Sequence, residues 1–206
     1  MFDKSYFNGK GSGYKHGYES LKNKSRWKPF VKEILRFKNN GKALDIGCAF
    51  GFFLKYLPNF EKYGIDISIY AIERAKAIPK VKFFVHSIEN KTNFKKNYFD
   101  VITAFDVLEH LNNPSNALAE IRRLLKKDGI FLFTFPNTDC LIGRLEFLND
   151  KSHKNDAKEL KREIKKHFKI IEEKYVLHLG NSHPIISLKL PNFLRPNCFI
   201  IAKAKY

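Results

Sequence analysis

The stretch ALDIGCAFG, residues 43–51, joins a short apolar run with one carboxylate to a turn made of small residues, and residues 50–57 then return to helical spacing. The apolar run is typical of a buried strand. Small residues at positions 47, 49 and 51 allow a tight turn and let a ligand approach the backbone closely. A strand, a small-residue turn and a helix in this order form the first unit of an α/β sheet.

The same alternation continues along the chain. Further strands are predicted at 62–66, 81–85, 99–105 and 129–135. Helices are predicted at 27–38, 70–78, 114–128 and 157–168, of which the third opens at Asn113-Pro114 and ends at Gly129. Two final strand-like runs, 169–177 and 198–206, have no helical pattern between them, so they are expected to be antiparallel. The prediction is a doubly wound, seven-stranded α/β sheet, mostly parallel with an antiparallel C-terminal strand and with helices on both faces.

Composition limits the class of protein. The chain has 206 residues, of which 44% are hydrophobic, so it is predicted to be one globular domain rather than a disordered chain. Three widely spaced cysteines exclude a disulfide framework and favour a reducing, cytoplasmic environment. No run is long enough to be a membrane span, and the N-terminus has no apolar signal core.

The net charge of +17 is concentrated at the two ends of the chain; residues 151–206, for example, hold 13 Lys and Arg against 5 Asp and Glu. Such a field attracts phosphates, nucleic acid or acidic metabolites. A lysine-rich proteome or thermal adaptation would give the same excess. The charge therefore leaves both interpretations open.

The ligand site is expected at the carboxyl ends of the parallel strands, near the point where strand order reverses. Asp66 ends the second predicted strand, 19 positions after Gly47, and a carboxylate there can accept hydrogen bonds from both hydroxyls of a ribose. The dinucleotide pattern GxGxxG fits poorly, because positions 49 and 52 are Ala and Phe. NAD binding is therefore not expected.

The first turn resembles another pattern, (Asp/Glu)-x-Gly-x-Gly-x-Gly, with Asp45, Gly47, Ala49 and Gly51 in its positions and alanine for the middle glycine. That pattern belongs to class I S-adenosylmethionine-dependent methyltransferases. The segments YGIDIS, FFVHSIEN and FDVITAFDVLEHLNNPSNALAEIRRLLKKDGIFLFTFPN follow in the order found in the small-molecule branch of this superfamily, as in ubiquinone and sugar methyltransferases. The resemblance covers residues 43–137 well and 150–206 in outline. It implies a Rossmann-like fold, S-adenosylmethionine as the cofactor and S-adenosylhomocysteine as the product.

The resemblance also implies roles for individual residues. Asp45 and the amides around Gly47 would serve the methionine part of the cofactor, and Asp66 would hold the ribose. Where the family often has Asp, this chain has Ser87, which could bond the adenine amine without a charge. The full set of expected cofactor-binding residues is Asp45, Gly47, Cys48, Ala49, Gly51, Asp66, Ile67, Ser87, Ile88 and Phe105.

Structural roles remain open for several of them. Asp45 could instead cap the following helix, Asp66 could be a solvated strand-end residue, and Ser87 could be an ordinary turn residue. Cys48 is expected to be a small buried side chain rather than a nucleophile.

On the acceptor side, Asp106, Glu109 and His110 follow the fourth predicted strand, where a base could deprotonate a hydroxyl or ammonium. They are the candidate catalytic residues, although His110 could also only cap or pack a helix. No metal is expected, because the spacing of His153, His178 and His183 matches no zinc site. The aromatic, glycine-containing leader, residues 1–18, is expected to fold over the cofactor as a lid, although a frayed terminus is equally compatible with its composition.

The leading hypothesis is a methyltransferase (EC 2.1.1.-) acting on an O- or N-nucleophile of a small or medium-sized metabolite. Lys10, Lys15 and Lys22 would border the acceptor entrance and favour an anionic acceptor. The alternatives are a tRNA or rRNA methyltransferase, favoured only by charge, and a non-catalytic cofactor-binding scaffold. The chain lacks the (Asn/Asp/Ser)-Pro-Pro-(Tyr/Phe) run of base N-methylases after the fourth strand. Residues 1–38 are expected to form the lid and first helix, 39–137 the cofactor-binding half and 138–206 the substrate-side half. The oligomeric state is not predicted.

Overall fold

The computed structural model describes residues 2–9, 16–150, 152–179, 183–187, 191 and 195–205. These residues form one sheet whose strands lie in the order β3-β2-β1-β4-β5-β8-β6-β7. The strands are β1 Gly41–Ile46, β2 Phe60–Asp66, β3 Val81–Val85, β4 Phe99–Phe105, β5 Leu125–Pro136, β6 Phe168–Leu179, β7 His183–Ser187 and β8 Asn197–Ala204.

Helices alternate with the first five strands, except that no helix lies among the described residues between β3 and β4. They are α1 Lys4–Phe7, α2 Lys24–Leu35, α3 Phe52–Tyr56, α4 Ile69–Ala75, α5 Pro114–Leu124, α6 Leu141–Asn149 and α7 Ala157–His167, with short 3-10 turns η1 Tyr18–Lys22 and η2 Leu108–His110. Among the described residues, no helix is both long and apolar enough to cross a lipid bilayer.

The doubly wound topology predicted from the sequence is confirmed. Strand β1 pairs in parallel with β2 on one side and β4 on the other, so the chain reverses its direction of winding between β3 and β4. Strand β8 is antiparallel to both β5 and β6. The seven expected strands are present, and a short extra strand, β7, pairs with β6 at the edge of the sheet.

The largest boundary difference from the sequence prediction lies between α5 and β5. Helix α5 ends at Leu124, not at Gly129, because the chain passes directly into β5 at Leu125 and begins to pair with Phe99 there. A β-bulge between Phe99 and Val101 absorbs the change in register. Helix α6 and strand β7 were not predicted, since neither segment has a strong periodic pattern.

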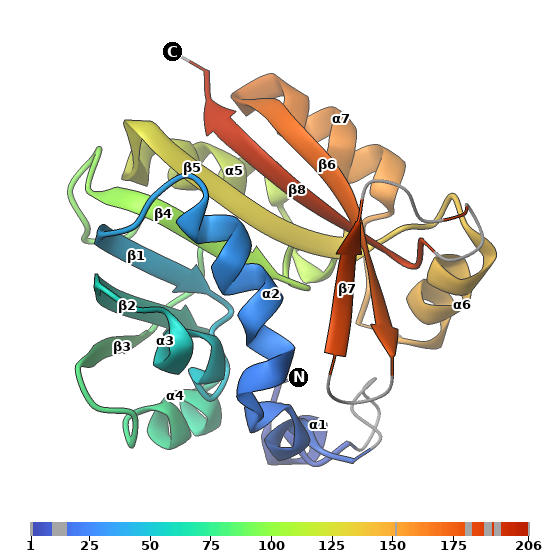
Figure 1. Ribbon diagram of the computed structural model, residues 1–206, viewed down its shortest axis with the longest axis horizontal. Helices are drawn as coiled ribbons and strands as arrows, with labels where there is room; N and C mark the ends of the chain where they lie inside the picture. The colour runs from blue at the N-terminus through green and yellow to red at the C-terminus, as the bar shows by residue number, and fades with distance from the viewer. Residues whose placement is uncertain are drawn as a thin grey trace.

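Each face of the sheet buries its own hydrophobic cluster because side chains alternate along a strand. Ala43 and Val101 face the cluster that contains α2, α3 and α4. Leu44 and Ile102 face the opposite cluster, which contains α5 and α7. Figure 1 shows the consequence, with α2 crossing one face of the sheet and α7 lying beyond the other.

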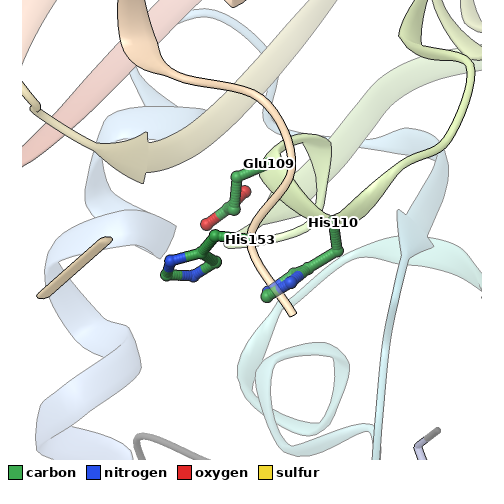
Figure 2. A group of neighbouring side chains, drawn as sticks. All are labelled: Glu109, His110 and His153. Atoms are coloured by element: carbon green, nitrogen blue, oxygen red, sulfur yellow. The ribbon is translucent and has the colours of Figure 1, made fainter. Parts of the chain in front are cut away.

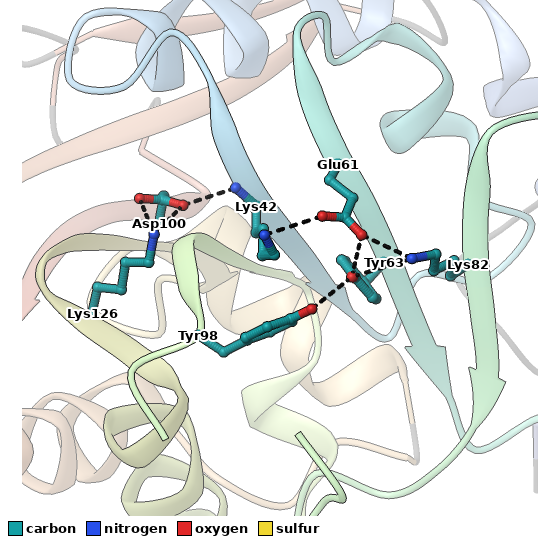
Figure 3. Close-up of polar contacts among 7 residues, drawn as sticks. All are labelled: Lys42, Glu61, Tyr63, Lys82, Tyr98, Asp100 and Lys126. Carbon is teal, nitrogen blue, oxygen red and sulfur yellow. Dashed lines mark hydrogen bonds and ion pairs between the residues drawn. The ribbon is translucent and has the colours of Figure 1, made fainter. Parts of the chain in front are cut away.

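A polar network joins the amino ends of the strands (Figure 3). The Glu61 carboxylate accepts from Lys82 Nζ at 2.8 Å and pairs with Lys42 at 3.2 Å, linking β1, β2 and β3. Asp100 on β4 accepts from the Lys42 backbone N–H at 2.8 Å and from Lys126 Nζ at 2.9 Å. Ligands of such sheets bind at the carboxyl ends, so this network lies at the end of the sheet away from the expected site.

Candidate functional site

The turn between β1 and α3 has an unusual backbone. Gly47 has φ +65°, and a Cβ at this position would lie 2.4 Å from Val107 Cγ2. Ala49 has φ +47° and Gly51, which caps α3, has φ +72°. Left-handed conformations at alternate positions explain the need for small residues here. Alanine at position 49 is therefore tolerated rather than ideal.

Asp66, at the carboxyl end of β2, holds this turn in place. Its Oδ2 accepts from the Ala49 N–H at 2.9 Å and its Oδ1 accepts from the Ser68 N–H at 2.8 Å. Burial raises the pKa of Asp66, whereas these backbone hydrogen bonds oppose that rise. Each carboxylate oxygen can accept a second hydrogen bond, and the side chain lines a cavity.

Asp45 is buried at the end of β1, where its Oδ1 accepts from Thr103 Oγ1 at 2.6 Å. The pKa of Asp45 is raised to about 7, chiefly by burial; the Thr103 hydrogen bond opposes this rise, and the nearby Asp66 contributes to it. A cationic group beside Asp45 would reverse this penalty, because it would favour the charged carboxylate.

Two cavities adjoin the turn between β1 and α3. The larger cavity, of about 270 Å³, opens at the carboxyl ends of β1, β2 and β4. This is the position at which strand order reverses. Its lining combines residues of these strand ends, the leader and the loops after β3 and β4: Phe2, Tyr6, Phe7, Tyr18, Ile46, Gly47, Ala49, Asp66, Ile67, His86, Ser87, Ile88, Glu89, Phe105, Asp106, Val107, His110, Leu111, Asn112 and Lys154.

A smaller cavity, of about 40 Å³, adjoins the first and shares Tyr18, Gly47, Phe105 and Asp106 with it. Asp45 and Arg26 both line this smaller space. The two cavities therefore share walls at the turn after β1, with a buried carboxylate on each side.

The predicted catalytic residues lie at one end of the larger cavity. Asp106 has φ +54° and its Oδ1 accepts from Thr134 Oγ1 at 2.6 Å. His110 lines the cavity, and its pKa is lowered by burial first and by His153 second. Glu109 is fully buried behind the lining, and burial together with the nearby Asp106 raises its pKa well above the usual range.

The leader covers the same cavity. Phe7 is only 4% exposed, and its ring lies 5.0 Å from Phe50 and 5.6 Å from Tyr18, centre to centre. Phe2 packs edge-on against His110 at 5.6 Å. These aromatic contacts tie the leader to the turn after β1 and to η2. Lys10 and Lys15, expected near the acceptor entrance, lie outside the described residues.

Most residues expected to bind the cofactor line one of the two cavities. The larger cavity is lined by Gly47, Ala49, Asp66, Ile67, Ser87, Ile88 and Phe105, and the smaller one by Asp45, Gly47, Cys48 and Phe105. Gly51 lines neither cavity and instead packs against Phe83. Among the candidate catalytic residues, Asp106 and His110 line the larger cavity, whereas Glu109 does not.

Arg26 and Lys154 line the cavities but were not predicted from the sequence. Arg26, on α2, lines the smaller cavity, but in the sequence it is one of many basic residues on a helix. Lys154 follows α6, and its N–H donates to the Glu109 carbonyl at 2.7 Å, so the loop after α6 lies against η2. Because these segments are more than forty residues apart, no local pattern indicates this contact.

Comparisons with known proteins give matches in sequence and in fold. The model of the methyltransferase domain family matches residues 18–179. An uncharacterized protein of Methanocaldococcus jannaschii is 33% identical over 158 residues, which are 75% of this chain and 68% of that protein. The ubiquinone biosynthesis O-methyltransferase of Nitrosomonas europaea is 25% identical over 115 residues, 52% of this chain and 49% of that enzyme. The chain thus spans about half to two thirds of these relatives.

Among solved structures, a SAM-dependent methyltransferase of Thermotoga maritima, described as a possible histamine N-methyltransferase, has a TM-score of 0.72 at 20% identity and covers 93% of this chain and 94% of its own. At this identity the likeness shows a shared fold. The family match covers well over half of the residues. The chain therefore belongs to the methyltransferase domain family, and S-adenosylmethionine is its cofactor.

Proposed function

We propose that this protein transfers the methyl group of S-adenosylmethionine to an oxygen or nitrogen nucleophile of a small or medium-sized metabolite. The observation that carries the proposal is the larger cavity, which has the Asp66 carboxylate in its wall and Asp106 and His110 at its other end. One cavity therefore contains a group that can bind a nucleoside and groups that can accept a proton.

The described residues fit the cofactor. Asp66 would accept the ribose hydroxyls, because each of its oxygens uses only one lone pair on the turn. Ile67 and Ile88 would pack on the adenine, beside Ser87. The raised pKa of buried Asp45 suits a site for the ammonium of the methionine part.

Arg26 adds a group that the sequence did not indicate. It lines the smaller cavity together with Asp45, so a carboxylate and a guanidinium border the same space. An amino acid with a free ammonium and a free carboxylate needs this combination of charges. We therefore assign the methionine part of the cofactor to the smaller cavity.

The bound cofactor supplies an electrophilic methyl group on a sulfonium, and the protein's own groups have to orient the acceptor, exclude water and remove a proton. His110 Nδ1 lies 2.9 Å from Ser152 Oγ, which itself donates to Asp150. The hydroxyl therefore accepts from Nδ1–H, which leaves the Nε2 lone pair of neutral His110 free to take a proton. Asp106 lies beside it as a second candidate base.

The leader would complete the site as a lid, since its aromatic side chains form part of the cavity wall. Exclusion of water strengthens the electrostatic contacts inside a closed site. In this proposal residues 1–38 form the lid and first helix, 39–137 the donor half and 138–206 the acceptor half. Lys154, in the acceptor half, borders the cavity and favours an anionic acceptor.

Two binding measurements and one transfer assay test the function. Calorimetry should show binding of S-adenosylhomocysteine and none of NAD. Transfer of labelled methyl from S-adenosylmethionine to fractionated small metabolites should then exceed transfer to tRNA or rRNA. Transfer confined to RNA, with a steep salt dependence of RNA binding, would replace this proposal by the nucleic-acid alternative. Cofactor binding without transfer to either pool would favour a scaffold.

A further inference from the structure

A buried cluster next to the larger cavity is not explained by methyl transfer. One carboxylate oxygen of Glu109, one ring nitrogen of His110 and one ring nitrogen of His153 all lie within 4.8 Å of one another. Figure 2 shows the three side chains gathered around a common space. Glu109 and His110 come from η2, whereas His153 comes from the loop after α6.

The Glu109 carboxylate has no visible partner. The side chain is 0% exposed, and neither of its oxygens has a hydrogen-bond partner among the described residues. An orphaned buried carboxylate is costly, so such groups are normally paired, protonated or bound to a cation. The two imidazoles facing it offer lone pairs rather than a counter-charge.

Both histidines are oriented by their other nitrogen. His153 Nδ1 lies 2.9 Å from the Phe147 carbonyl, which can only accept, so Nδ1 carries the proton and Nε2 keeps its lone pair. The Ser152 hydroxyl donates to Asp150 and accepts from His110 Nδ1, which leaves His110 Nε2 in the same state. Outer hydrogen bonds of this kind orient the histidine ligands of metal sites.

We propose that Glu109, His110 and His153 bind one divalent transition-metal cation, with Zn²⁺ as the best-fitting common ion. Two imidazole nitrogens and one carboxylate oxygen are a ligand set that zinc and related ions use, and hard ions such as Mg²⁺ prefer oxygen alone. Tetrahedral bonds of about 2.0–2.2 Å would draw the three ligand atoms closer by up to about 1.5 Å. This proposal replaces the expectation of no metal, which rested only on spacing along the chain.

The site would keep a position open toward the cavity, because His110 is part of the cavity wall. A hydroxyl of the acceptor bound there would lose its proton more easily, so the cation would take over the role assigned to free His110. This consequence rests on the proposed methyl transfer, whereas cation binding itself does not.

The test is a direct binding measurement on the full chain after treatment with a chelator. Calorimetry with ZnCl₂ should give one site per chain, and Co²⁺ should give a visible spectrum typical of coordinated nitrogen. The variants Glu109→Gln and His153→Gln should each weaken Zn²⁺ binding at least 100-fold. The outer variant Ser152→Ala should weaken it about 10- to 100-fold.

The matched control is His167→Gln, which removes a histidine on α7 outside the cluster and should leave Zn²⁺ binding unchanged. Thermal melting without metal and binding of S-adenosylhomocysteine identify any variant that fails to fold. Absence of stoichiometric binding to the wild-type chain would overturn the proposal. So would undiminished binding by folded Glu109→Gln and His153→Gln variants, which would place the ion elsewhere. Neither outcome would affect the test of methyl transfer.

Discussion

The substitution Asp45→Asn separates two effects of this buried carboxyl group, namely its effect on folding stability and its effect on cofactor binding. In the free protein, burial raises the pKa of Asp45 from 3.8 to about 7. Asp45 therefore stays protonated in the folded state over a pH range in which it has lost its proton in the unfolded chain. Such a group stabilises the fold least at high pH: its favourable contribution is complete below about pH 4 and is lost as the pH rises to about 7.

The size of the effect follows from the two pKa values. Their difference corresponds to about 4 kcal/mol of unfolding free energy. Asparagine has nearly the shape of the carboxyl group and no charge to lose. The gain in stability of Asp45→Asn over the wild type should therefore grow by up to about 4 kcal/mol between pH 4 and pH 7, and then stay constant.

Urea denaturation of both proteins from pH 4 to pH 8, without cofactor, measures this difference. Asp100→Asn is a control for total charge, because it removes a carboxylate from the opposite end of the sheet; it should give no such gain. A difference between Asp45→Asn and wild type that is the same at every pH would refute the reasoning, since it would show that ionised Asp45 is not penalised in the fold.

The Asp45→Asn variant should also bind the cofactor more weakly than the wild type. An ammonium beside Asp45 favours the charged carboxylate, so the affinity of the wild type for S-adenosylhomocysteine should rise between pH 6 and pH 7.5. The variant should lack this rise and bind at least tenfold more weakly at pH 7.5. An equal pH dependence in both proteins would place the ammonium elsewhere.

Four further results are expected. Asp66→Asn leaves one oxygen for two backbone N–H groups, so calorimetry should show a loss of about 10- to 100-fold in S-adenosylhomocysteine affinity. Gly47→Ala should lower the unfolding free energy by about 1–3 kcal/mol, and adding Val107→Ala should restore part of it by removing the 2.4 Å contact. Trypsin should cleave the first 24 residues more slowly when S-adenosylhomocysteine is bound; equal rates would contradict a lid. Asn155→Ala removes donors to the Leu108 and Leu111 carbonyls, so it should raise KM for the acceptor and leave cofactor affinity unchanged.

The residues proposed for the donor half of the site could be predicted because their signals are local. An acid, three small residues and a second acid each stand at the end of a strand, and a parallel sheet places all strand ends at one edge. The positive φ angles at Gly47, Ala49 and Gly51 are the backbone counterpart of that pattern. Alternation of strands and helices then supplied the topology without any long-range information.

The boundary errors have the opposite cause, because they come from pairing between segments that are distant in the sequence. Gly129 was expected to end a helix because glycine often does, but pairing of Leu125 with Phe99 sets the start of β5 four residues earlier. Strand β7 lies at the edge of the sheet and exists through its pairing with β6. Partners distant in sequence therefore decided both cases, and a local reading has no access to them.

The acceptor half depends on contacts of that distant kind. The N–H groups of Lys154 and Asn155 both donate to the Glu109 carbonyl, and the buried Asn155 amide donates to Leu108 and Leu111 carbonyls. These bonds hold the loop after α6 against η2 and so carry His153 to His110, with ring centres 4.8 Å apart. The residues proposed to bind the methyl donor lie on one strand–turn–helix unit and the strand beside it, whereas the acceptor side depends on a loop clamped by hydrogen bonds to the backbone. Such a loop can change its exposed side chains while the clamp stays in place.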